Sequence, residues 1–303
     1  MDLRPASPEE IRRRLENGLR NKNPRSTLAS ALAHKKTLRL GNRVDPYQPA
    51  EIEHKVSRQV QFILVDLNWT YVIQTRFLHI LKRDEDIMRK ALKRKLIHIM
   101  PVISPGAEGD WELFERKRTT PIPHRLKFIR RWVNKGFPVG VNGEPFIPGY
   151  HTPKQFRDIL RRLKEVGVNS YNVYNLHFND HVAKRLHEIG LDIERIWHYN
   201  QDKQWKPILS RLLEIARQED ILLGCPDFVN SGWEWVEGAN TCCGINVPNP
   251  SRYNSHHWKQ MIQEGKEPEE ILEKTWEGIG DRKAGQDIVR GNPGEFYTMD
   301  DIE

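Results

Sequence analysis

Five polar side chains in this sequence follow short apolar runs and have the chemistry to bind a small polar ligand. Asn42 and Asp45 come after the first such run, and a carboxylate in that position binds ribose hydroxyls in nucleotide-binding folds. Arg76 follows the second run and could clamp a carboxylate through two parallel hydrogen bonds. Glu144 or Gln74 could accept hydrogen bonds from the N–H groups of an amino group. These side-chain types indicate a site for a ligand with hydroxyl, carboxylate and amino groups.

The elements before these side chains decide whether they can meet. Short β-rich runs alternate with longer amphipathic stretches, which predicts a parallel sheet with right-handed crossovers. Ligands of such folds bind at the carboxyl ends of the strands, so we expect the five side chains to converge on one mouth. The predicted strands are 37–40, 71–75, 97–103, 138–141 and 168–176, and the predicted helices are 49–66, 84–95 (with Asp84 as its N-cap), 123–135 and 152–166.

The strand–helix repeat predicts the organisation of the 303 residues. A complete eight-unit barrel needs about 250 residues in repeating form, whereas the repeats here end near Gly190. We therefore expect a partial parallel barrel over 1–190. An irregular lobe with a helix at 204–219, a short strand at 221–225 and a Cys- and Trp-rich segment should occupy 191–277. Few apolar anchors lie in 278–303, which predicts a partly disordered tail.

The most informative motif is the string Gly-Asn-Arg-Val-Asp-Pro-Tyr-Gln-Pro-Ala-Glu over residues 41–51. It resembles the Gly-x-x-x-Asp-Pro-Tyr-Gln-Pro-x-Glu loop of the radical S-adenosylmethionine family, in the branch related to spore photoproduct lyase. Segments 73–76, 114–126 and 144–149 resemble later motifs of that branch, in the same order along the chain. The resemblance covers 5–190 and depends mostly on the first string.

The resemblance implies a fold, a cofactor and a set of binding residues. The fold would be a barrel of the radical S-adenosylmethionine type, related to the TIM barrel, with about five of the six family strands. The cofactors would be S-adenosylmethionine and a 4Fe-4S iron–sulfur cluster. The residues at the matching positions, as cofactor-binding candidates, are Asn42, Asp45, Gln48, Gln74, Arg76 and Glu144, and the resemblance assigns no catalytic residue.

The chain departs from the family at the cluster. The family ligates its cluster with a Cys-x3-Cys-x2-Cys loop after the first strand, but no cysteine precedes Cys225 in this sequence. Two explanations are open. A second polypeptide supplies the missing strand and loop, or the chain is a relative that has lost radical chemistry. We favour the first explanation because the downstream motifs are still recognisable.

Three cysteines form a second candidate site: Cys225, Cys242 and Cys243. Three thiolates can hold an iron–sulfur cluster and leave one iron open, so these residues are candidate ligands of an auxiliary cluster. Their spacing matches no recognised ligand pattern, and buried, inert cysteines are the competing interpretation. The odd number argues against a disulfide framework.

Charge and hydropathy limit the remaining function classes. The net charge of +7 indicates either solvated helix faces, for example at Arg157, Arg161, Arg162 and Lys164, or a surface for nucleic acid. The longest apolar runs are too short to span a bilayer and no secretion signal is evident, so we expect a cytoplasmic protein with no membrane partner. No phosphate loop, nucleophile elbow or zinc-protease signature occurs.

Two functions from different classes remain. The chain is the adenosylmethionine-binding part of a radical enzyme, acting on nucleic acid or nucleotides, or it is an inactive barrel relic that binds nucleic acid or protein through its basic surface. An unrelated hydrolase is disfavoured because no convincing acid–base pair occurs. We expect Glu115 to be an ion-pair partner at one end of the barrel and not a catalyst.

Overall fold

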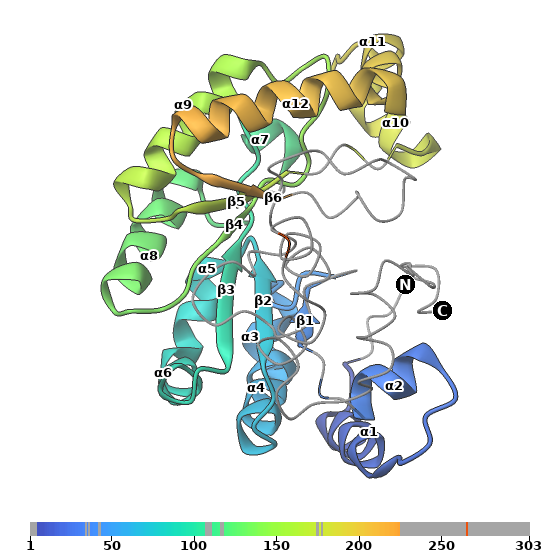
Figure 1. The fold of residues 1–303 in the computed structure, drawn as a ribbon, viewed down its shortest axis with the longest axis vertical. Coiled ribbons are helices and arrows are strands. Elements are labelled where there is room, and N and C mark those ends of the chain that lie inside the picture. Colours follow the sequence, from blue (N-terminus) through green and yellow to red (C-terminus); the bar gives the residue numbers. More distant parts are fainter. Residues whose placement is uncertain are drawn as a thin grey trace. The chain divides into compact units, whose positions relative to one another are not determined.

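A computed structural model gives the fold of the chain (Figure 1). It describes residues 5–33, 35, 37–41, 44–106, 111–115, 118–173, 176, 178–224 and 265. The predicted Cys- and Trp-rich segment and the tail therefore lie outside the described residues. Within the described part, the chain divides into two compact units between His98 and Ile99.

The first unit is built on parallel strands. Leu38 pairs with Tyr71 and Leu40 with Ile73, and the sheet has the order β1-β2-β3. Strand β2 is buried along its whole length, as in a strand covered on both faces. The elements are α1 (Pro8–Arg20), α2 (Thr27–Ala33), β1 (Leu38–Leu40), α3 (Ala50–His54), α4 (Val56–Asp66), β2 (Tyr71–Thr75), α5 (Leu78–Leu81), the 3-10 helix η1 (Lys82–Asp84), α6 (Glu85–Lys93) and the start of β3 (Ile97–Pro101).

The second unit carries another set of parallel strands, in the order β4-β5-β6. Val141 pairs with Tyr171, and Ser170 with Leu222. Helices α9 and α12 pack against each other, as Figure 1 shows. The elements are α7 (Trp111–Phe114), α8 (Ile122–Asn134), β4 (Val141–Asn142), α9 (Pro153–Glu165), β5 (Ser170–Asn172), α10 (Asp180–Glu188), α11 (Ile193–Asn200), α12 (Asp202–Gln218) and β6 (Leu222–Gly224).

The prediction of a mixed α/β fold with parallel strands is confirmed, but the last strand is placed differently. The short strand predicted at 221–225 is β6, and it pairs in parallel with β5 instead of lying in an irregular lobe. The sequence pattern assigns this strand to a separate lobe because it is only three residues long and follows three consecutive helices. Its pairing shows that it belongs to the sheet of the second unit.

The helix predicted over 49–66 is broken in two at Lys55. This residue has a φ of 52°, and its backbone N–H donates to the carbonyl of Glu51 at 3.1 Å. The Glu51 carboxylate then accepts from the backbone N–H groups of Ser57 and Arg58 at 2.9 and 3.1 Å. The first turn of α4 is thus capped by a side chain from α3, which satisfies donors that a helix start leaves open.

Other helix ends follow the sequence signals. Helix α9 begins with a capping box between Thr152 and Gln155, with Pro153 at its first position. Gly136 and Gly167 follow α8 and α9 with φ values of 79° and 85°, the left-handed conformation that ends many helices. The helix ends predicted from residue type at these positions are confirmed.

The helices of the described residues do not suit a bilayer. None of them is both long and apolar enough to cross a membrane. The longest, α12, has 17 residues and carries charged side chains along its length.

Candidate functional site

The loop after β1 lies directly against the end of β2. Gly41 has a φ of 108°, and a Cβ atom there would lie 2.3 Å from the backbone oxygen of Gln74 and 2.9 Å from Cδ of Pro46. Both distances are shorter than real Cβ contacts, so only glycine permits this approach. The loop that carries the motif is therefore fixed at the carboxyl end of a parallel strand, where ligands of such folds bind.

Asp45 ties this loop to the end of β2. Its Oδ1 accepts hydrogen bonds from the Thr75 hydroxyl at 2.6 Å and from the backbone N–H of Tyr47 at 2.9 Å, and its Oδ2 accepts from the backbone N–H of Arg76 at 2.8 Å. Burial raises the pKa of Asp45 above its ordinary value, although these hydrogen bonds and the charge of Arg76 oppose the rise. An ionised carboxylate has about four acceptor positions, so the chain itself occupies most of them.

The other candidates of the first unit lie on the same two segments. Gln74 is buried near the end of β2, and its side-chain oxygen accepts from the guanidinium of Arg39. Gln48 donates its backbone N–H to the carbonyl of Asp45 at 3.3 Å. Asn42 lies outside the described residues. The structure thus places the carboxylate of Asp45 on the backbone N–H of Arg76, and the convergence of the five side chains on one mouth stays a prediction.

Beneath the loop lies a buried polar network that sequence analysis missed. The Tyr47 hydroxyl donates to Oδ2 of Asp84 at 2.9 Å, and the Gln61 amide donates to the same oxygen at 3.3 Å. The Tyr71 hydroxyl in turn donates to Oε1 of Gln61 at 3.1 Å. All four side chains are fully buried. Burial and the charge of Asp84 hold the pKa of Tyr47 well above its ordinary value, so its hydroxyl remains a donor.

Two arginines complete this network at its outer side. Arg83 contacts Oδ1 of Asp84 at 2.7 Å and Oε1 of Glu51 at 2.8 Å. Arg58 contacts Asp84 at 3.2 Å and Asp86 at 2.8 Å. Asp84 precedes α6, as expected of its N-cap, but its side chain makes no capping bond. The predicted N-cap position is confirmed, but the carboxylate binds two guanidinium groups and two buried polar side chains instead of the first turn of the helix.

Glu144, the remaining candidate, belongs to the second unit. Its Oε2 accepts from the amide of Asn142 at 2.9 Å, and its backbone carbonyl accepts from the Ser104 hydroxyl at 2.6 Å. Its peptide bond to Pro145 is cis. Glu144 is thus held on the segment after β4, and its convergence with the candidates of the first unit stays a prediction.

The turn after Glu144 is held by a buried histidine. Nδ1 of His151 accepts from the backbone N–H of Ile147 at 2.9 Å, and the ring packs against Phe114, Phe146 and Tyr150. Among the described residues, the buried Nε2 has no hydrogen-bond partner. Burial lowers the pKa of His151 to about 3, so the ring is neutral at neutral pH.

We expect His151 to make the protein less stable as the pH falls. An unfolded chain binds a proton near the ordinary pKa of 6.5, whereas the folded chain does so only near 3. The stability contributed by His151 is therefore complete above pH 6.5 and is lost progressively toward pH 3, by at most about 1.4 kcal/mol per pH unit. The free energy of unfolding, measured in urea between pH 7 and pH 5, should change less steeply with pH in His151→Gln than in the wild type. His198→Gln, on the exposed face of α11, should keep the wild-type slope of unfolding free energy against pH. Equal slopes for all three proteins would contradict this assignment.

Glu115 has the role expected of it. The buried guanidinium of Arg125 binds both carboxylate oxygens of Glu115 and also donates to the carbonyls of Thr120 and Val102. The side chains of Arg125 and Glu115 are 0% and 8% exposed. The prediction that Glu115 is an ion-pair partner is confirmed, and this pair joins α8 to the segment before it.

A metal centre is not formed within the described part of the chain. Those residues contain no group of three or more His, Cys, Asp or Glu side chains placed to hold a metal ion. Cys225, Cys242 and Cys243 lie outside the described residues, so the auxiliary cluster stays a prediction.

Comparisons with known proteins add little. No protein-family model and no curated protein matches the chain. Among solved structures, the HMG-CoA lyase from Brucella melitensis is similar at 13% sequence identity, with 77% of each chain covered and a TM-score of 0.31. At that TM-score the likeness carries no argument about this chain.

Proposed function

We propose that this chain is a radical-S-adenosylmethionine-like protein that binds S-adenosylmethionine at the loop after β1. A second polypeptide supplies the cluster-bearing strand and loop, and the assembled enzyme acts on nucleic acid or nucleotides. The observation that carries the proposal is the position of Asp45, which is bound to Thr75 and Arg76 at the carboxyl end of β2.

The electrostatics of Asp45 support a cationic ligand. Burial raises the pKa of this carboxylate, which means that its charged form is poorly solvated and gains from a nearby positive charge. The sulfonium of S-adenosylmethionine supplies such a charge, and its ribose supplies hydroxyl donors for the remaining acceptor position of Asp45. Arg76 follows directly along the chain, and we assign its guanidinium to the carboxylate of the ligand.

The cluster does not enter this assignment. When bound, a 4Fe-4S cluster would supply the electron that cleaves S-adenosylmethionine, but no cysteine falls among the described residues of this chain. The proposal for the described residues is therefore confined to binding and orienting the ligand. It assigns no catalytic residue.

The melting temperature of the full chain tests the binding site. S-adenosylmethionine at about one hundred times its dissociation constant should raise the melting temperature by roughly 5 °C or more. S-adenosylhomocysteine, which lacks the sulfonium charge, should raise it less. Arg76→Gln should reduce the shift, whereas Arg89→Gln, on the exposed face of α6 in the same unit, should leave it unchanged. The absence of any shift in the wild-type protein at millimolar ligand would refute the proposal.

The alternative is a barrel relic without radical chemistry that acts as a basic binding module. It shares the fold and the charge of the first candidate but needs no adenosylmethionine. The same titration separates the two, since a relic that has lost the cofactor would show no shift.

A further inference from the structure

The carboxyl ends of β4 and β5 carry two asparagines side by side. Asn142 is the last residue of β4 and Asn172 the last residue of β5, and the two are partners in the parallel register. Both residues are 0% exposed. Partners in a parallel sheet point to the same face, so the two amides lie on one face at the edge where ligands of parallel folds bind.

This face points away from α9. The ring of Tyr171 on β5 packs against Phe156 of α9, with the ring centroids 5.7 Å apart. Successive side chains of a strand point to opposite faces, so Asn172 and its partner Asn142 point away from that helix. The amide of Asn172 accordingly donates to Sδ of Met100 at 3.7 Å.

The amide of Asn142 is fixed in its orientation. Its Nδ2 donates to Oε2 of Glu144 at 2.9 Å, which identifies the nitrogen and leaves Oδ1 as the other atom of the amide. Within the part of the chain that the structure describes, this buried Oδ1 has no hydrogen-bond partner. A buried carbonyl oxygen without a donor costs free energy, so we expect Oδ1 to accept from an N–H or O–H group of a bound molecule.

The loop after β4 keeps this acceptor in place. A Cβ atom on Gly143 would lie 2.2 Å from Cζ of Tyr171, so only glycine permits this close approach. The backbone N–H of Gly143 donates to the carbonyl of Asn172 at 2.7 Å, which binds the loop to β5. Turning the amide of Asn142 over would set its oxygen against the carboxylate of Glu144. The position therefore presents an acceptor and not a donor.

We propose that Asn142 recognises the exocyclic amino group of the base in a nucleotide substrate. This inference rests on the proposed function, which takes nucleic acid or nucleotides as the substrate, and it narrows the choice of base. Cytosine and adenine carry an amino donor where uracil, thymine and hypoxanthine carry an oxygen acceptor. An acceptor whose own amide nitrogen is bound to Glu144 favours the amino bases and disfavours the oxo bases.

Calorimetric titration of the full chain with cytidine monophosphate and uridine monophosphate tests this inference. The two nucleotides have the same ribose and phosphate, so the basic surface of the chain contributes equally to both. The cytidine nucleotide should bind about tenfold more tightly, because uracil would set an oxygen against Oδ1. The pyrimidin-2-one nucleotide keeps the ring nitrogen of cytosine but lacks the amino group, and it should lose the same factor.

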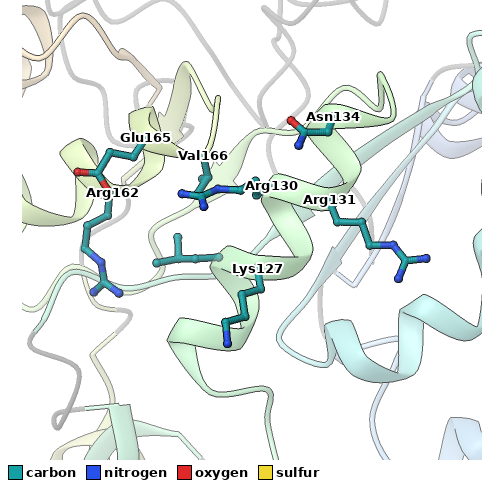
Figure 2. Close-up of a pocket in the computed structure, with 8 residues that line it drawn as sticks. Lys127, Arg130, Arg131, Asn134, Arg162, Glu165 and Val166 are labelled. Atoms are coloured by element: carbon teal, nitrogen blue, oxygen red, sulfur yellow. The ribbon is translucent and has the colours of Figure 1, made fainter.

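Asn142→Leu removes the acceptor and nearly conserves the volume of the side chain. It should weaken the binding of cytidine monophosphate about tenfold and abolish the preference over uridine monophosphate. Asn134→Leu is the matched control and should keep the preference, because Asn134 lies exposed at the end of α8 in the same unit (Figure 2). If Asn142→Leu melts well below the wild type, the three nucleotides decide the question on the wild-type protein.

S-adenosylmethionine is a second source of an amino group, because its adenine carries one. Asn142→Leu should leave the rise in melting temperature caused by S-adenosylmethionine unchanged, and a loss of that rise would assign Asn142 to the cofactor and overturn the inference. Equal affinities for the two nucleotides, tighter binding of uridine monophosphate, or no binding of either would also overturn it, since a water molecule would then complete Oδ1. A preference for cytidine monophosphate in a wild-type protein that S-adenosylmethionine does not stabilise would support the inference and refute the adenosylmethionine site alone.

Discussion

Replacing Asp84 with alanine is expected to lower the free energy of unfolding by about 3–5 kcal/mol. The substitution removes a fully buried carboxylate, which leaves the hydroxyl of Tyr47 without its acceptor and removes one of the two acceptors of the Gln61 amide. It also removes one carboxylate from each of Arg58 and Arg83. Equilibrium urea unfolding, followed by circular dichroism, measures the loss.

Asp86→Ala is the matched control for this substitution. Asp86 binds the same guanidinium of Arg58, which lowers its pKa to about 2, but its side chain is 55% exposed. A solvent-screened pair of this kind contributes at most about 1 kcal/mol. Similar losses in Asp84→Ala and Asp86→Ala would show that the buried network is not what stabilises the first unit.

The second large effect is expected at Arg125 in the other unit. Arg125→Met should also cost about 3–5 kcal/mol, because it removes the buried guanidinium that binds the 8% exposed carboxylate of Glu115 and donates to two backbone carbonyls. Arg130→Met, on the exposed face of α8, should change the stability by less than about 0.5 kcal/mol. The same urea transition measures both variants.

A double variant separates a lost ion pair from a general packing defect. If the cost comes from the uncompensated charge, Arg125→Met/Glu115→Leu should be clearly more stable than Arg125→Met alone, because replacing both charges by apolar side chains is often nearly neutral. A double variant that is less stable than either single variant would mean that each substitution carries its own packing cost. The first outcome supports the uncompensated charge as the cause, and the second refutes it.

The strands and helix ends were predictable because their signals are local. Tyr71–Thr75 is bounded by polar residues and was predicted to the residue, and the capping box at Thr152 needs only the side chain three positions later. Parallel strands bring their carboxyl ends to one edge, which explains why the loop after β1 lies close to the end of β2. The strand β6 was harder to assign, because a three-residue strand shows no period of its own.

The contacts that could not be predicted join residues far apart in the sequence. Tyr47 and Asp84 are 37 positions apart, and nothing around Asp84 indicates that it faces a buried tyrosine instead of the first turn of α6. The same holds for the contacts of α9. Arg161 binds Glu219, which is 58 positions away, and nothing in the sequence around Arg161 indicates this partner.

The buried positions of Tyr47 and Glu51 bear on how this sequence evolved. Both belong to the string by which the chain resembles radical S-adenosylmethionine proteins, and both bind structural partners, Asp84 and Arg83. Natural selection for a folded protein would retain them whether or not catalysis continued. A lineage that had stopped making radicals would therefore keep much of the same string. The presence of the string in a sequence can thus reflect selection for folding as well as selection for catalysis.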